Sequence, residues 1–317
     1  MVKPSEFWYG RPHMGITRRD FGRLALASVP LVAAARLKAT GVAQAAARPN
    51  SKWAGVQVGM NVPYNFGTGN YTSGDDILAR TVQLGVSAVE LRSQPVELFL
   101  GAPGQRASAE QMRVFRTSAP LTRVADFRRK YEDAGVAIEI VKFDGILSFT
   151  DQVLDYAFDL AKALGARAIS CELPVKQVDA AKRLGDFAAK HQMMIGFHGH
   201  TQMTPAIWEQ AFTYSNYNGA NLDLGHFVGG NKTSPMPFLL KHHDRITHIH
   251  VKDKTLGDVN VPFGQGDTPI KEALQAIRDN HWNMQATIEF EYPVPAGSDR
   301  MTELAKCVEY CRQCLIG

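Results

Sequence analysis

Several features are scarce in this 317-residue chain, and each scarcity removes a class of protein. Four cysteines are too few for a small scaffold held together by disulfides. No G-x-G-x-x-G turn follows the first β-rich run, Val56 to Asn61, so the usual signature of a dinucleotide-binding open sheet is missing. With 45% hydrophobic and 21% charged residues, the composition is that of a globular protein rather than a disordered one.

The first 45 residues read as an export signal rather than as part of a fold. An Arg-Arg pair before Phe21 is followed by the uncharged run 24–35, which is too short to span a bilayer comfortably. A small-residue stretch then offers cleavage near Ala45 or Ala47. The paired arginines are typical of twin-arginine export, which moves folded proteins. We therefore expect a cleaved leader, no stable membrane anchor, and a periplasmic or exported protein.

The leader also carries the positive charge of the chain. Residues 1–45 hold seven Lys and Arg against two acidic residues, a net of +5, whereas the whole chain has +4, so the remainder has −1. A nearly neutral domain offers no electrostatic basis for binding nucleic acid. We expect one mature domain at 46–317 that has no nucleic-acid partner.

Short β-rich runs alternate with longer amphipathic runs along this domain. Small turn residues such as Gly85, Gly135 and Gly165 stand just before three of the β-rich runs, where a preceding helix would end. Eight strand candidates are found, at 56–61, 88–92, 136–143, 166–172, 193–200, 220–224, 246–252 and 285–291. Eight such units in about 270 residues match the count and size of a (β/α)8 TIM barrel, which we predict as an α/β fold.

One connection is longer than a barrel requires. Nearly thirty residues separate Arg92 from the helix expected near Thr122, more than an ordinary loop between a strand and a helix. In a barrel this segment would start at the face where substrates bind, so it is interpreted either as a lid or pocket wall, or as an inert surface insertion.

Ionisable residues stand at the carboxyl ends of four of the later strands. Glu172 ends the fourth and Asp223 the sixth, and the eighth offers both Glu289 and Glu291 on its inward face. The seventh strand, with the sequence THIHVKD, has His248, His250 and Lys252 on one face. Because the carboxyl ends of barrel strands meet at one mouth, these side chains are expected to converge there. Carboxylates with one imidazole suit a single divalent ion such as Mn²⁺, Co²⁺ or Mg²⁺, with Zn²⁺ as a further candidate.

Six stretches, most of them in the second half of the chain, resemble the sugar phosphate isomerase/epimerase superfamily, the xylose isomerase-like TIM barrels. They are CELP at 171–174, FHGH at 197–200, LDLGHFVGGN at 222–231, HIHVKD at 248–253, FGQGD at 263–267 and IEFEYP at 288–293. The resemblance spans roughly Val56 to the C-terminus. It implies the barrel fold, a carbohydrate substrate and one bound metal ion.

The resemblance also implies roles for individual residues. The metal ligands would be Glu172, Asp223, His250 and Glu289, with Glu291 as an alternative to Glu289. His248 would then lie one layer deeper than His250.

Other residues would contact the substrate. His226, from the Asp-x-x-His pattern, would bind a substrate oxygen, and His198 with His200 would bind hydroxyls or form an interior pair. The superfamily's epimerases have an arginine six residues beyond the seventh-strand ligand, where this chain has Leu256. Lys252 or Lys142 is therefore expected to contact the sugar instead.

The resemblance and the leader together predict an exported, metal-dependent isomerase or epimerase. The substrate would be an unphosphorylated keto-sugar or related polyol, and the reaction would pass through an enediolate. Glu172 and Glu289 would transfer the proton as an acid/base pair. The alternative is a 3-keto-glycoside lyase that uses the same proton abstraction for β-elimination. A non-catalytic sugar-binding barrel is less favoured, because binding alone needs no metal flanked by two carboxylates.

Overall fold

The computed structural model describes residues 48–317, which belong to one compact unit. The leader predicted at 1–45 lies outside the described residues, so its cleavage and the exported location stay predictions. No helix in the described part is long and apolar enough to cross a bilayer.

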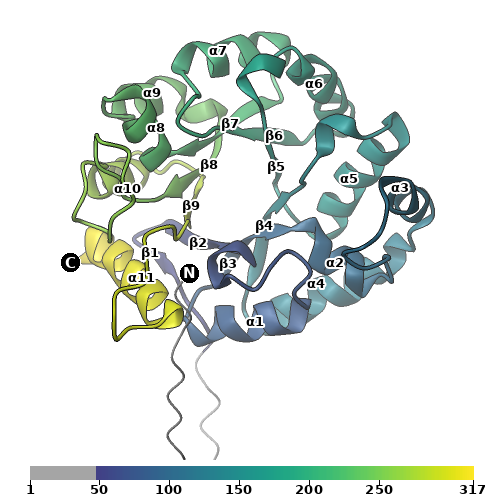
Figure 1. Cartoon of the computed structure of the whole chain (residues 1–317), viewed down its shortest axis with the longest axis horizontal. Helices are drawn as coiled ribbons and strands as arrows, with labels where there is room; N and C mark the ends of the chain where they lie inside the picture. Colours follow the sequence, from purple (N-terminus) through teal and green to yellow (C-terminus); the bar gives the residue numbers. More distant parts are fainter. Residues whose placement is uncertain (1–47) are drawn as a thin grey trace, which may run out of the picture. The chain divides into compact units, whose positions relative to one another are not determined.

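Eight parallel strands form a closed barrel, and the predicted (β/α)8 fold is confirmed (Figure 1). The last strand pairs with the first through Val58 and Ala286, a closure that a doubly wound open sheet lacks. The strands are β2 (Val56–Val62), β3 (Ala88–Arg92), β4 (Ala137–Lys142), β5 (Ala168–Glu172), β6 (Met194–His198), β7 (Asn218–Asp223), β8 (Ile246–Val251) and β9 (Gln285–Ile288). A short strand, β1 (Lys52–Trp53), pairs antiparallel with β2; it is too short to carry a periodic pattern and was not predicted.

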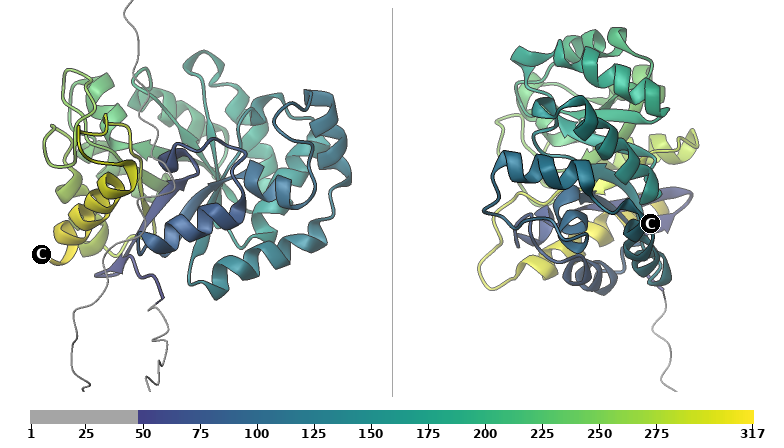
Figure 2. Two further views of the ribbon diagram at one scale, coloured as in Figure 1. Left: turned by 60° about the horizontal axis from the view of Figure 1, so that its bottom comes forward. Right: turned by 90° about the vertical axis from the view of Figure 1, so that its right-hand side faces the viewer.

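Helices surround the barrel on its outside (Figures 1 and 2). They are α1 (Gly74–Gln83), α2 (Ser93–Phe99), α3 (Ala109–Ser118), α4 (Val124–Asp133), α5 (Asp151–Ala163), α6 (Ala180–His191), α7 (Pro205–Tyr214), α8 (Leu224–Asn231), α9 (Met236–His242), α10 (Ile270–Asp279) and α11 (Arg300–Ile316). Gly85, Gly135 and Gly165 follow α1, α4 and α5 with φ of 69°, 81° and 79°. This left-handed conformation suits glycine and ends each helix as the sequence indicated.

The long connection after β3 folds as two helices. α2 begins at Ser93, directly after the strand, and α3 packs against α5 in the outer ring (Figure 1). Arg116 of α3 forms an ion pair with the buried Glu97 of α2. The segment is therefore built into the outer helical layer.

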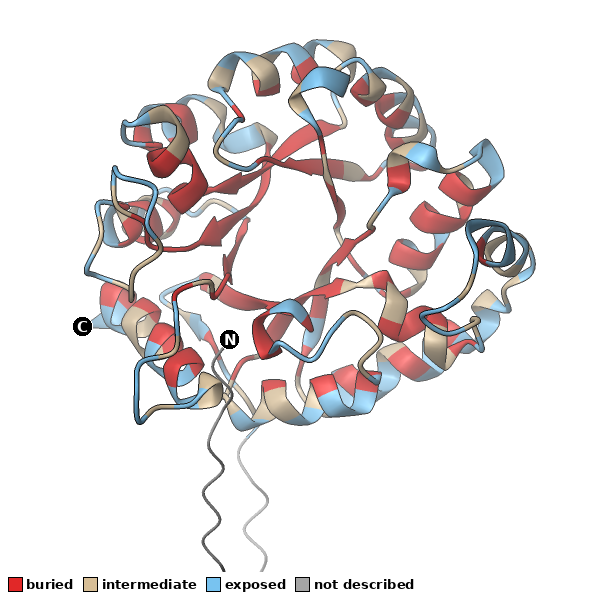
Figure 3. Cartoon of the chain, viewed as in Figure 1, coloured by how far each residue is buried: buried red, intermediate tan, exposed pale blue. Residues whose placement is uncertain are grey.

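Side chains alternate between two buried regions. Ile249 and Val251 of β8 are fully buried among apolar residues, whereas His248 and His250 on the other face are buried inside the barrel. Figure 3 shows the same pattern over the whole chain, with buried strands and with helices exposed on their outer faces. The alternation predicted for THIHVKD is confirmed, and it places polar side chains inside the barrel.

Two side chains fix the strand ends from which the site is built. The side-chain amide of Asn65 donates to the Ile288 carbonyl (2.7 Å), and its oxygen accepts from the Phe290 amide (2.9 Å), on both sides of Glu289. The indole of Trp208 donates to the Phe197 carbonyl (3.0 Å), beside His198. Both donors are buried, so these bonds form without competition from water.

We predict that Asn65→Ala destabilises the protein by about 3 kcal/mol, because it leaves a buried carbonyl and a buried amide without partners. The free energy of unfolding, measured by urea denaturation of each variant, provides the test. Asn280→Ala removes a solvent-exposed hydrogen bond to the Ala276 carbonyl, and it should lower the free energy of unfolding by less than about 0.5 kcal/mol. Equal effects of the two substitutions would contradict this role of Asn65.

Candidate metal centre at the barrel mouth

The end of β7 shows why aspartate and histidine stand three residues apart. Asp223 is the last residue of the strand, and its Oδ1 accepts from the amide of His226 (2.7 Å), which caps the N-terminus of α8. The cap occupies one carboxylate oxygen, and the other, Oδ2, faces Lys252 and His250 in the site. The first turn of the helix places the His226 imidazole beside it.

Four side chains present donor atoms that all lie within 4.8 Å of one another. They are His198 of β6, Asp223 of β7, His226 of α8 and Glu289 after β9, and all four are buried. Within the described part of the chain, Asp223 Oδ2, His226 Nδ1 and Glu289 Oε2 make no well-aligned hydrogen bond. Buried polar atoms left without partners are costly. Two carboxylate oxygens and two imidazoles suit a divalent ion, so these residues fit a metal centre.

His250 faces the same group from β8. Its Nδ1 lies 3.4 Å from Glu289 Oε1 and 3.7 Å from Asp223 Oδ2, whereas its Nε2 lies 2.5 Å from Oε2 of Glu90. A carboxylate on the far nitrogen is the usual way in which a metal-binding imidazole is oriented. Burial lowers the pKa of His250, but the charges of Glu90 and Glu289 outweigh this effect and raise the pKa well above its usual value.

Glu90 is a functional candidate that the sequence reasoning missed. It lies fully buried on β3, whose sequence is AVELR. The available signal was a carboxylate in the middle of this short strand, between an apolar valine and an apolar leucine. His248 Nε2 lies 3.4 Å from the same carboxylate, and burial lowers the pKa of His248 to about 4. His248 is thus in contact with Glu90, whereas His250 also faces Asp223 and Glu289.

The ammonium of Lys252 lies among three carboxylates of the site. Nζ is 3.1 Å from Asp223 Oδ2, 2.6 Å from Glu289 Oε2, 2.8 Å from Glu291 Oε2 and 2.8 Å from His226 Nε2. The side chain is only 1% exposed. Burial lowers the pKa of Lys252, but the three carboxylates outweigh this effect and raise it. The predicted substrate contact is therefore, in this structure, a buried counter-ion.

Glu172 lies apart from the other predicted ligands. Its Oε1 is 2.7 Å from Nζ of the buried Lys142, its Oε2 is 3.4 Å from His200 Nε2, and its side chain is 42% exposed. Three of the predicted ligands, Asp223, His250 and Glu289, are thus close together, and Glu172 stands nearer to solvent.

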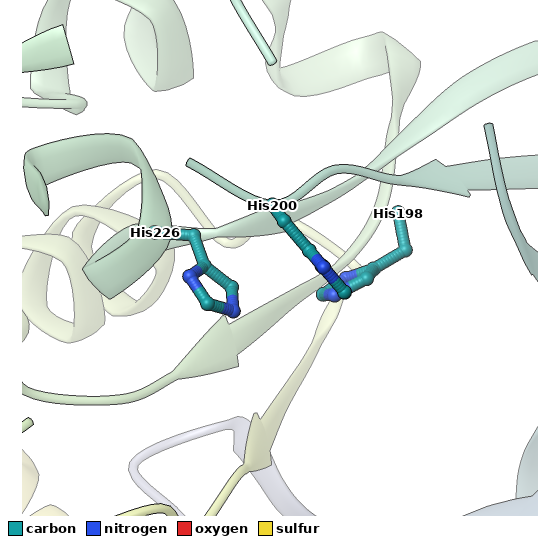
Figure 4. A group of neighbouring side chains, drawn as sticks. All are labelled: His198, His200 and His226. Carbon is teal, nitrogen blue, oxygen red and sulfur yellow. The ribbon is translucent and has the colours of Figure 1, made fainter. Parts of the chain in front are cut away.

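The two histidines of FHGH are not equivalent. His198 is the buried last residue of β6, whereas His200 follows the strand and is exposed, so the strand ends two residues earlier than predicted. Burial, with the charges of Lys142 and His250, lowers the pKa of His198 well below its usual value. Their ring centroids are 5.0 Å apart, and His226 lies 4.9 Å from His200 (Figure 4). The buried imidazoles of His198 and His226, next to the exposed one of His200, offer donors and acceptors for hydroxyl groups.

The two glutamates near β9 also differ. Glu289 is buried and accepts from Asn61 Nδ2 (2.9 Å). Glu291 is 20% exposed and accepts from the Tyr64 hydroxyl (2.7 Å). Because β9 ends at Ile288, simple strand alternation does not extend to either residue. The geometry favours Glu289 as the ligand and places Glu291 toward solvent.

The sequence matches one family profile. The family described as xylose isomerase-like TIM barrel aligns with residues 78–314, a range that contains Glu90 and every predicted ligand. No curated protein gave a significant sequence match.

Several solved structures are similar in fold. The probable 3-DHS dehydratase from Bacillus anthracis is 14% identical, with a TM-score of 0.58 over 80% of this chain and 99% of that one. The 3-keto-D-glucoside 4-epimerase from E. coli is 12% identical, with a TM-score of 0.57 over 82% and 100%. A D-allulose 3-epimerase from a Methylomonas species, in complex with D-allulose, is 14% identical, with a TM-score of 0.55 over 81% and 96%.

We predict that Glu90→Gln weakens Mn²⁺ binding about 10–100-fold, because His250 loses the charged partner that orients its ring. Isothermal titration calorimetry on chelator-treated protein measures the affinity. Glu97→Gln removes another buried glutamate, one that pairs with Arg116 between α2 and α3, and it should leave the affinity unchanged. Equal losses in both variants would indicate general destabilisation instead of a role for Glu90 at the site.

Proposed function

Because this chain belongs to the xylose isomerase-like TIM barrel family, we propose that it is a metal-dependent isomerase or epimerase of an unphosphorylated keto-sugar or related polyol. The observation that carries the proposal is the buried donor group of His198, Asp223, His226 and Glu289 at the carboxyl ends of the strands. Active sites of TIM barrels lie at this face.

Asp223 and Glu289 would hold the ion, together with His250 through Nδ1 or with His198. A bound divalent ion would stabilise the negative charge that develops on a ketose oxygen when the neighbouring C–H bond is broken. We retain Glu172 as a predicted ligand, although its present contacts, Lys142 and His200, favour a second role.

That role is proton transfer. Glu172 is reachable from solvent, with a side chain 42% exposed, and Lys142 Nζ lies 2.7 Å from its Oε1. A carboxylate in this position can accept a proton from a substrate carbon. Glu172 would take the proton from the carbon next to the carbonyl. In an epimerase Glu289, protonated beforehand from solvent, would return that proton to the opposite face of the carbon, and Glu172 would then release its own proton to solvent.

The surroundings suit a substrate with many hydroxyl groups. His200 and His226 line one side of the mouth, and Arg92 and Gln94 both contact the carboxylate of Asp144, which follows β4. Two proteins of the same fold bear names that refer to keto-sugars, D-allulose and a 3-keto-D-glucoside. These names support the substrate class without selecting its member.

Export would narrow the substrate further. Phosphorylated sugars are scarce outside the cytoplasm, so the leader predicted at 1–45 favours an unphosphorylated substrate. The intact mass of protein recovered from the producing cell's envelope fraction tests this proposal. A mass that corresponds to a polypeptide starting near residue 46 or 48 supports the proposal. A full-length protein found in the cytoplasm contradicts it.

A lyase is the second candidate. Abstraction of the proton next to a 3-keto group, followed by loss of a glycosidic group from the adjacent carbon, uses the same base and the same ion. The similarity in fold to a 3-keto-glucoside epimerase is the observation that favours it.

We predict that the Mn²⁺-loaded protein exchanges the α-proton of a keto-sugar in D2O, as followed by NMR, and that Glu172→Gln slows this exchange by roughly 10²–10⁴-fold. Chelator should abolish it. Glu139→Gln, which changes a β4 glutamate that pairs with Arg167, should leave the rate unchanged. Exchange without bond cleavage supports the isomerase, and release of an aglycone from a 3-keto-glycoside supports the lyase. If neither substrate gives either event, the enzymatic proposal is contradicted.

A further inference from the structure

The contacts of Lys252 conflict with a bound ion, and the conflict points to a function of this residue. We propose that Lys252 is a built-in competitor of the metal: its ammonium holds Asp223 and Glu289 when no ion is bound, and it withdraws to Glu291 when the ion binds. This inference rests on the metal centre of the proposed function. It assigns to Lys252 control over the affinity of that centre.

The same two carboxylates serve both cations. Lys252 Nζ lies 3.1 Å from Asp223 Oδ2 and 2.6 Å from Glu289 Oε2. These two oxygens have no well-aligned hydrogen-bond partner within residues 48–317, and both side chains belong to the donor group that fits an ion. A divalent ion binds carboxylate oxygens at about 2.0–2.3 Å. An ammonium that stayed in place would be within a few ångströms of it, in a buried site where like charges repel strongly.

The stem of Lys252 is confined, so the movement would be limited to its end. A Cβ atom added at Gly225 would lie 3.0 Å from Lys252 Cγ and 2.9 Å from the Lys252 carbonyl oxygen. The chain of α8 therefore packs closely on the stem, and the absence of a side chain at Gly225 makes room for it. The terminal carbons and Nζ lie beyond this contact, and the lysine stem has rotatable bonds there.

Glu291 provides the place to which the ammonium withdraws. It already contacts Nζ at 2.8 Å, and it is 20% exposed, compared with 5% for the side chain of Glu289. The hydroxyl of Tyr64 donates to Glu291 at 2.7 Å and holds its carboxylate at the edge of the site. A short rotation of Lys252 would keep this ion pair and release the two deeper carboxylates.

The competitor stabilises the protein without metal. Without Lys252, the carboxylates of Asp223 and Glu289 would have, among the described residues, only the imidazole of His250 as a cationic neighbour. Buried charges that are poorly paired are strongly destabilising. Lys252 supplies a further positive charge, and the free energy of displacing its ammonium is subtracted from the free energy of metal binding. The affinity of the centre is therefore lower than its ligands alone would give.

Mn²⁺ titrations of Lys252→Met at fixed pH test the inference. We expect Mn²⁺ to bind at least tenfold more tightly than in the wild type, because the competing charge is gone. The control Lys254→Met removes another buried lysine, one that pairs with Asp258 outside the donor group, and should leave the affinity unchanged. Glu291→Gln should weaken Mn²⁺ binding in the wild type and have no such effect in Lys252→Met, because only the wild type needs a place for the displaced ammonium.

An unchanged or weaker affinity in Lys252→Met would overturn the inference. If that variant does not fold, Lys252→Gln and the single Glu291→Gln variant give the same test. If the wild type binds Mn²⁺ and the variants bind it equally well, only the competition by Lys252 is rejected. If neither the wild type nor any variant binds an ion, the metal centre is rejected as well. If Lys252→Met binds Mn²⁺ more tightly but the wild type shows no α-proton exchange, only the proposed reaction is rejected.

Discussion

Carboxylates crowded at one end of a barrel need positive charge, and the rest of this site depends on how that charge is supplied. Asp223, Glu289 and Glu291 share the ammonium of Lys252, and Glu90 faces His250. Burial makes each pairing strong and makes each missing partner costly. The arrangement is therefore stable only with cations in place, and both a lysine and a divalent ion meet that need.

The barrel makes this concentration of charge possible because the hydrogen bonds of its strand backbones are already formed. Closure between β2 and β9 pairs the strand edges, and hydrogen bonds from Asn65 and Trp208 fix the strand ends beside Glu289 and His198. Side chains on such ends cannot move apart to relieve their repulsion. A rigid mouth that contains the long side chain of Lys252 would be suited to exchange one cation for another.

The sequence allowed the barrel and the inward faces of its strands to be predicted, because strand alternation depends only on local order. Asp223 and His250, which were expected to converge from two strands, lie side by side on β7 and β8, with 3.7 Å between Oδ2 and Nδ1. Contacts between side chains were beyond its reach: alternation cannot show that Lys252 folds back onto Asp223, or that Glu172 turns toward Lys142. Glu90 was missed for a related reason, since its partner His250 lies 160 residues away. Rotamers and long-range pairs are decided by packing, which no local pattern contains.

The central claim is that Asp223, Glu289 and an imidazole hold one divalent ion at the barrel mouth. The most direct test is an anomalous difference map from a crystal of the mature protein grown with Mn²⁺. The account predicts one peak about 2.0–2.3 Å from oxygens of Asp223 and Glu289 and close to a nitrogen of His250 or His198, with Lys252 turned toward Glu291. A peak confined to Glu90 and His248, or no peak at the mouth, would contradict it.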